Sequence, residues 1–149
     1  MNIFDNHRIN SFLSSQRLGV IATLSFQDKS PEVAMVYYAI DENFNIFILT
    51  SKKSRKFQNI IKNKKVAFLV GQEVDPVVIQ MEGVASIVVD PDIKIKIEQK
   101  LTRLGNLNPD SLSFPPSFYL SQKNEIIQII VNKLKYSNFS AGGNDIIEF

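Results

Sequence analysis

Hydrophobic and polar positions alternate along the chain in short blocks that are typical of β-strands joined by tight turns. A polar turn at residues 27–30 separates the first two blocks, and a hairpin turn at 41–43 separates the second from the third. Gly83 interrupts the fifth and longest block, where we expect a bulge or bend. The predicted strands span residues 18–26, 33–40, 44–49, 66–70, 77–89 and 125–136.

Three segments show the helical spacing of apolar residues instead. The first follows Asn6, which we expect to cap it, and the third ends at Gly105, a residue typical of helix C-termini. We also expect a short helical turn at 117–121 and a loosely held tail at 140–149. The apolar stripes are Ile9, Phe12 and Leu13, then Phe57, Ile60 and Ile61, then Ile97, Leu101 and Leu104.

The order of these elements decides the fold class. A doubly wound parallel sheet would need a helix after each strand, and the chain lacks that alternation. A closed antiparallel barrel leaves no strand edge exposed and accommodates helices on its outside. We therefore predict a mainly β fold, a six-stranded antiparallel barrel with peripheral helices, in a single domain over residues 1–149.

Composition narrows the classes of function. The net charge of +2 over 149 residues is too small to argue for nucleic acid. The chain has no cysteine and a single histidine, His7, so a zinc site or a Ser-His-Asp triad has little to be built from. Residues 1–10 lack the apolar segment of a signal peptide, and no apolar run approaches the ~20 residues that span a bilayer. We therefore expect a cytoplasmic protein with no nucleic-acid or membrane partner.

The start of the second predicted helix is unusually basic. A helix N-terminus carries a partial positive charge, so cations are unfavourable there, and this turn contains no acidic residue to offset them. Cations together with hydroxyl groups at a helix start are typical of a phosphate site. The alternative is a solvated junction in a lysine-rich chain. The cations are Lys52, Lys53, Arg55 and Lys56, and the hydroxyls, each a possible N-cap, belong to Thr50, Ser51 and Ser54.

The rest of the sequence contains no motif that assigns a reaction. Neither standard glycine-rich nucleotide loop is present, and the carboxylates are scattered without a recognisable catalytic pair. Tyr37 and Tyr38 lie in a predicted strand without interleaved basic residues, so they do not form an RNA-binding face. Most of the aromatic residues are better explained by core packing.

From Thr50 to Lys56 the chain resembles the pyridoxamine 5′-phosphate oxidase-like family, the FMN-binding split barrels. That family has a strand ending in Thr, then three variable residues, then Ser-Arg-Lys opening a helix, as at residues 54–56 here. The resemblance implies a six-stranded split barrel that forms a homodimer with two flavins at its interface. It extends to Asn63, to residues 66–69 and 82–85, and to the order of elements from Phe12 to Tyr136.

The same resemblance implies a set of cofactor-binding residues. Two cations would hold the FMN phosphate, neighbouring hydroxyls would add hydrogen bonds, and the backbone of the second strand would lie along the isoalloxazine ring. FMN is the cofactor we expect, with FAD, a deazaflavin and heme as the alternatives used within this wider family. The residues at these places are Arg55 and Lys56, then Thr50, Ser51 and Ser54, then Met35 and Val36.

Departures from the family pattern concern the substrate rather than the cofactor. The oxidase proper carries an Arg and a Lys on its second strand, where this chain has Val33 and Tyr38. Val78 stands where the family has a glutamine, and the C-terminal Arg-x-His substrate motif has no counterpart. A phosphate-bearing substrate needs cations of its own. We therefore do not expect pyridoxine 5′-phosphate oxidase activity.

Two functions from different classes remain. The first is a flavin-dependent oxidoreductase that acts on an unidentified small molecule, in which the flavin carries the redox chemistry and the protein binds and orients it. The second is a non-catalytic protein that holds flavin or heme for storage or sensing. The single histidine weakens the heme alternative, because imidazole is a common axial ligand of heme iron.

Overall fold

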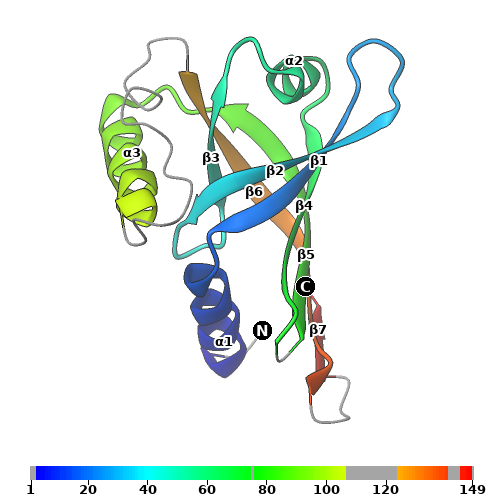
Figure 1. Ribbon diagram of the computed structural model, residues 1–149, viewed down its shortest axis with the longest axis vertical. Helices are drawn as coiled ribbons and strands as arrows, with labels where there is room; N and C mark the ends of the chain where they lie inside the picture. The colour runs from blue at the N-terminus through cyan, green and yellow to red at the C-terminus, as the bar shows by residue number, and fades with distance from the viewer. Residues whose placement is uncertain (1–2, 75, 107–123, 141–144, 149) are drawn as a thin grey trace.

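The structure, a computed structural model, describes residues 3–74, 76–106, 124–140 and 145–148, and Figure 1 shows how their helices surround a β-barrel. The elements in chain order are α1 (Ile3–Ser15), β1 (Leu18–Leu24), β2 (Pro31–Ile40), β3 (Ile46–Ser51), α2 (Arg55–Lys62), β4 (Lys65–Gln72), β5 (Val77–Ile87), α3 (Pro91–Asn106), β6 (Asn124–Asn138) and β7 (Asp145–Glu148).

All strand pairs in the sheet are antiparallel, and the strand order is β3-β2-β1-β4-β5-β6-β7. β3 also pairs with β6, with Ile48 opposite Ile127, so the first six strands close on themselves. The predicted six-stranded antiparallel split barrel is therefore confirmed. β7 adds a short seventh strand along β6.

The barrel closes because each strand presents one apolar face inward. In β4 the side chains of Val66, Phe68 and Val70 are buried, while the residues between them are exposed. Inside the barrel the rings of Tyr38 and Phe68 meet edge to face, with their centroids 5.4 Å apart. Burial of such β-branched and aromatic side chains supplies most of the free energy that stabilises the fold.

The three helices of the described chain cover different parts of the barrel, and α1 and α2 lie at opposite ends of it (Figure 1). α1 is fixed by Tyr38, whose hydroxyl donates a hydrogen bond of 2.6 Å to the carbonyl oxygen of Leu13. α3 packs through Ile97 and Leu101 on a second apolar cluster that includes Phe47. None of these helices is long and apolar enough to cross a membrane.

The irregularity predicted at Gly83 is confirmed. The register between β5 and β6 shifts between Glu82 and Gly83. A Cβ atom at Gly83 would lie 2.5 Å from the carbonyl oxygen of Ile130, which is closer than a Cβ atom can approach an oxygen without a shift of the backbone. Glycine therefore allows the two strands to come together at the point where the barrel bends.

The helix ends differ from the sequence prediction. α1 begins at Ile3, so Asn6 lies inside the helix and does not cap it, and Asp5 instead supplies an acidic residue in its first turn. α3 continues through Gly105 to Asn106. Signals for helix termini are accurate only to a residue or two, because the last turn frays and competing caps lie close together.

The C-terminal tail was predicted to be loosely held, and this is wrong for β7. Its four residues pair with β6, and the carboxylate of Glu148 lies 3.1 Å from the ammonium of Lys135. Ile146 and Ile147 favour an extended strand because they are β-branched. The helical turn predicted at 117–121 lies outside the described residues.

Candidate cofactor-phosphate site

The turn between β3 and α2 confirms one of the three proposed helix caps. Ser54 is the N-cap residue, with φ −70° and ψ 149°, and its Oγ accepts a hydrogen bond of 3.2 Å from the backbone N–H of Phe57. The turn is closed by Ser51, whose carbonyl oxygen accepts from the N–H of Ser54 at 3.0 Å and whose Oγ accepts from the N–H of Lys53 at 3.2 Å. Ser51 therefore shapes the loop that leads into the helix.

The hydroxyl of Thr50 lies beneath this cap. Its Oγ1 is 2.8 Å from the Oγ of Ser54, and the residue is almost completely buried. When Thr50 donates this hydrogen bond, Ser54 accepts from both Thr50 and Phe57, and the hydrogen of its own hydroxyl is free to donate outward. The pair thus allows Ser54 to serve both the helix and a bound anion, with Thr50 acting through Ser54.

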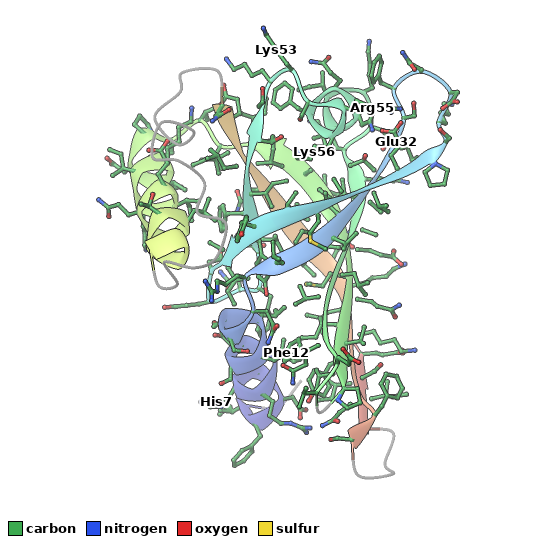
Figure 2. The ribbon with its side chains drawn as sticks, in the orientation of Figure 1. His7, Phe12, Glu32, Lys53, Arg55 and Lys56 are labelled. Carbon is green, nitrogen blue, oxygen red and sulfur yellow. The ribbon has the colours of Figure 1, made fainter. Side chains whose placement is uncertain are left out.

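Two of the four cations in this turn are compensated by carboxylates from other strands. Figure 2 shows Arg55 on α2 beside Glu32 on β2, and a guanidinium nitrogen of Arg55 contacts Oε1 of Glu32. The ammonium of Lys52 lies 3.1 Å from Glu125 on β6. The sequence shows no acidic residue in this turn, but the fold supplies two, so the unfavourable effect of the helix dipole is partly offset.

Glu125 also holds a second lysine, Lys94 of α3, at 3.4 Å. Desolvation acts to raise the pKa of Glu125, but hydrogen bonds and charge from Lys52 and Lys94 outweigh it, so the pKa lies below its ordinary value. Glu125 is therefore ionised at neutral pH and ties β6, α3 and the loop before α2 together. Because Lys52 is paired with Glu125, it is less available to bind a phosphate.

Lys56 differs from the other cations of the turn. Its side chain is half-buried, and desolvation lowers its pKa from the ordinary lysine value. Within the described part of the chain no carboxylate lies within ion-pairing distance of it. A partly desolvated cation without a counter-charge favours binding of an anion at this end of the barrel.

Lys56 and Arg55 line one cavity of about 450 Å³. Its remaining lining residues come from the hairpin of β1 and β2 and are Thr23, Glu32, Val33 and Ala34. The cavity therefore has a cationic wall from the first turn of α2 and a wall of mixed polarity from two strands. Thr50, Ser51 and Ser54 do not line this cavity, and Ser54 is the residue that precedes Arg55 at the helix start. Two cations at a helix start, next to a hydroxyl, form a donor set that fits a phosphate group.

Asn59 ties the two walls of this cavity together and was not recognised from the sequence. The residue is fully buried, its Oδ1 accepts from the N–H of Phe26 at 2.8 Å, and its Nδ2 donates to Thr23 at 2.9 Å and to Glu32 at 2.9 Å. Thr23 and Glu32 are also direct partners across the β1–β2 ladder. One amide thereby fixes α2, β1 and β2 relative to one another.

The two strand residues predicted to lie along a cofactor ring follow this cavity on β2. Met35 is 69% exposed and Val36 is buried, as alternation along a strand requires. Neither residue lines the cavity itself. Met35 is three residues beyond Glu32, which corresponds to roughly 10 Å along an extended strand. A flat group reaching from the cavity along β2 would meet the exposed Met35 side of the strand.

This side of the barrel carries two adjacent rows of side chains across several strands. Each row is apolar on β2, β1 and β4 and polar on β5 and β6, and a broad depression of about 770 Å³ lies over them. Val33 and Met35 are the most exposed apolar side chains of these rows, at 74% and 69%, although Met35 does not line the depression. The cross-strand partners are Met35, Val20, Leu69, Gln80 and Lys135 in one row, and Val33, Ala22, Ala67, Glu82 and Lys133 in the other.

The described residues offer few ligands for a metal ion or for heme iron. Among the described residues no group of three His, Cys, Asp or Glu side chains could hold a metal ion. His7 is exposed on α1, at the end of the barrel opposite Arg55 and Lys56 (Figure 2). Within one chain the histidine and the basic turn of α2 therefore cannot contact the same ligand.

Comparison with known proteins identifies the family of the chain. Residues 6–123 match the family described as pyridoxamine 5′-phosphate oxidase. The chain belongs to this family. No curated protein matches the sequence at a significant level.

Solved structures of low sequence identity share the fold of this family member. General stress protein 26 from Bacillus anthracis is 22% identical over 99% of this chain and 100% of its own, with a TM-score of 0.71. ChuZ from Campylobacter jejuni is 11% identical over 100% of this chain and 61% of its own, with a TM-score of 0.78. HutZ, the heme storage protein from Vibrio cholerae, is 15% identical over 83% of this chain and 87% of its own, with a TM-score of 0.63.

Proposed function

We propose that this member of the family is a flavoprotein that binds FMN at the start of α2. The observation that carries the proposal is Lys56, a half-buried cation without a carboxylate partner in the described chain, which lines the same cavity as Arg55. A phosphate there would receive a bidentate hydrogen bond from Arg55 and a point charge from Lys56. The hydroxyl of Ser54, backed by Thr50, adds a donor at the helix N-terminus.

The flavin would supply the redox chemistry, and the chain would bind it, orient it and exclude water. The backbone of β2 at Met35 and Val36 is the surface we assign to the ring. Because Met35 is largely exposed, one chain covers only one side of a group placed there. We propose an oxidoreductase acting on a small molecule, whose substrate would bind beside the part of the ring that this chain leaves uncovered.

Pyridoxine 5′-phosphate itself is not the substrate we propose. Val33 and Tyr38 stand where the oxidase proper has basic residues, and Tyr38 is buried with its hydroxyl donating to Leu13. Neither side chain can hold a substrate phosphate. Turnover of pyridoxine 5′-phosphate at about 1 per second or faster would contradict this part of the proposal.

A second candidate function is non-catalytic storage of heme, which is favoured by the fold shared with a heme storage protein. His7 is the obvious protein ligand for heme iron, but it lies on α1 at the opposite end of the barrel from the basic turn (Figure 2). A heme held at α2 would therefore need a different axial ligand from the same chain. This is why we place flavin first.

We also propose that two copies of the chain associate through the rows of side chains on the outside of β2, β1, β4, β5 and β6. A second copy of the chain is the partner that we propose. A two-fold interface uses the same patch on both subunits, so the exposed apolar part of this face can be buried against the identical face of the other copy. Light scattering at micromolar concentration should then give about twice the chain mass of 16.9 kDa. Leu69→Asp should reduce it, and a monomeric wild type with FMN present would contradict the proposal.

The absorbance spectrum of the purified protein is the direct test of the cofactor. Paired near-ultraviolet and blue bands would support flavin, and a sharp Soret band would replace our proposal with heme. If the protein is colourless, titration with FMN and with riboflavin decides the matter. We expect FMN to bind much more tightly than riboflavin, because only FMN carries the phosphate that Arg55 and Lys56 would hold. Equal affinity for the two would overturn the phosphate assignment.

A further inference from the structure

The carboxylate of Glu32 is shared between two partners on α2. Oε2 accepts a hydrogen bond of 2.9 Å from the buried amide of Asn59, and Oε1 contacts a guanidinium nitrogen of Arg55. Glu32 and Arg55 both line the candidate phosphate cavity, and Figure 2 shows them side by side there. In the free protein the guanidinium that we assign to the phosphate is therefore already bound to an anion of the chain itself.

We propose that Glu32 is a specificity-determining residue that competes with the cofactor phosphate for Arg55. The inference rests on the phosphate site proposed above and goes beyond it, because it assigns the strength and charge selectivity of that site to a carboxylate on another strand. Arg55 has two states, paired with Glu32 when the cavity is empty and turned to the phosphate when it is filled. Binding of a phosphate must then break an existing ion pair.

The arginine is the member of the pair that moves. The backbone of Glu32 is held in the β1–β2 ladder, directly opposite Thr23. Its side chain is held by fully buried Asn59, which donates to Oε2. The Glu32 side chain is only 20% exposed, whereas that of Arg55 is 73% exposed. A long exposed side chain can change rotamer at small cost, and a carboxylate fixed from the buried side cannot.

The fixed carboxylate also sets which charges the cavity accepts. Two negative charges close together repel each other, and the repulsion grows with the charge on the ligand. Glu32 therefore weakens binding of a doubly charged phosphate monoester more than binding of a ligand with less charge. Riboflavin, which has no phosphate, should not be affected through this contact.

The test is the substitution Glu32→Gln, which keeps an oxygen for Asn59 and removes the charge that holds Arg55. Its matched control is Glu42→Gln, which removes the same charge from an exposed carboxylate in the turn after β2, at the other end of the strand. FMN, riboflavin and inorganic phosphate are titrated against both variants and the wild type. Melting curves show whether each variant is folded.

We expect Glu32→Gln to tighten FMN about two- to fivefold, which matches the strength of an exposed ion pair that no longer has to be broken. Glu42→Gln should leave FMN affinity unchanged, and riboflavin should bind equally to all three proteins. The gain in FMN affinity from Glu32→Gln should shrink in an Arg55→Ala background, because there is then no arginine for the carboxylate and the phosphate to compete for. Unchanged or weaker FMN binding by Glu32→Gln would overturn the inference, because Glu32 would then only orient Arg55.

Two further measurements separate this inference from the cofactor assignment. If FMN binds none of the proteins, the proposed function fails, and phosphate binding followed by ³¹P NMR decides the role of Glu32 alone. Tighter phosphate binding by Glu32→Gln would still support competition, and equal binding would overturn it. A crystal structure of the wild type with FMN or phosphate needs no variant: Arg55 should have left Glu32, and a retained contact would contradict the proposal.

Discussion

Nδ2 of Asn59 lies 2.9 Å from Oε2 of Glu32, so a fully buried amide on α2 fixes the position of a carboxylate on β2. The same Nδ2 donates to Thr23, and Oδ1 accepts from the backbone of Phe26. Every polar atom of the Asn59 side chain is therefore used. The arrangement makes this residue the structural support of the phosphate cavity, although it does not line the cavity itself.

Asn59→Ala should destabilise the fold strongly for a polar residue. It leaves the N–H of Phe26 and the hydroxyl of Thr23 without their partner, and each buried group left unsatisfied costs about 1–3 kcal/mol. Urea denaturation measures the loss. Gln58→Ala, at the exposed neighbouring position, loses only an exposed hydrogen bond to the carbonyl oxygen of Lys52 and should lower the free energy of unfolding by about 1 kcal/mol or less. Similar losses in both variants would show that Asn59 has no special role.

Arg55→Ala should weaken FMN by about 1.5–3 kcal/mol, the range for a hydrogen bond to a charged group, or roughly tenfold to hundredfold. Riboflavin affinity should hardly change. Lys62→Ala, at the other end of the same helix, is the control for loss of a positive charge. If Arg55→Ala weakens FMN and riboflavin equally, the residue supports the fold or the ring and does not hold the phosphate.

The effect of Arg55→Ala on the empty protein tests a separate point. The helix dipole alone predicts that removing this cation does no harm. The contact with Glu32 acts in the opposite direction, but Arg55 is exposed, and such pairs are worth about 0.2–1 kcal/mol. We therefore expect a loss of stability no larger than this range in a denaturant titration.

Lys56→Met should stabilise the empty protein while abolishing tight FMN binding. Burial lowers the pKa of Lys56 in the folded state below its unfolded value of 10.5, so the unfolded chain binds more protons between the two values. Wild-type stability should consequently rise with pH through that window, and the variant should lack this part of the rise. Denaturation of both proteins at neutral and alkaline pH checks the difference in slope. An equal or steeper rise in the variant would contradict the prediction.

Gly83→Ala should destabilise the barrel, because the added Cβ would lie 2.5 Å from the carbonyl oxygen of Ile130 and 2.9 Å from a methyl carbon of Ile129. Backbone of β6 would have to shift, and overpacking of this kind costs about 1–3 kcal/mol. Gly71→Ala provides the control, since its nearest contacts would be at an ordinary 3.6 Å. Comparable melting temperatures for the two variants would show that the bulge can relax.

The barrel was predictable because its strands follow local rules. Alternation in β4 and the turn at residues 41–43 can be recognised without knowing what lies next to them. The cap at Ser54 could be narrowed to three hydroxyls for the same reason. The strand at the end of the chain could not be predicted in this way, because β7 is a strand only through its pairing with β6.

The polar residues around the phosphate cavity were missed because they depend on contacts between distant segments. Helical spacing predicted Ile61 on the buried face of α2, yet Ile61 is 49% exposed and Asn59 is buried instead. A lone asparagine gives no sequence signal that it will be enclosed. Glu32 pairs with Arg55, and Glu125 pairs with Lys52. Only the pairing of the strands brings these carboxylates next to the turn before α2. A correct register for the β1–β2 hairpin would have placed Glu32 opposite Thr23 and given a first indication.

The candidate site and the closed barrel depend on different spans of the chain. Thr23, Glu32 and Asn59 all belong to the segment from β1 to α2, whereas closure requires β3 to pair with β6, far downstream. Pairings between distant segments carry a larger loop entropy and slow folding. Since synthesis delivers the N-terminal part first, every residue of the phosphate cavity leaves the ribosome before the strand that closes the barrel. The nascent chain thus has its phosphate ligands available at an earlier stage than its completed core.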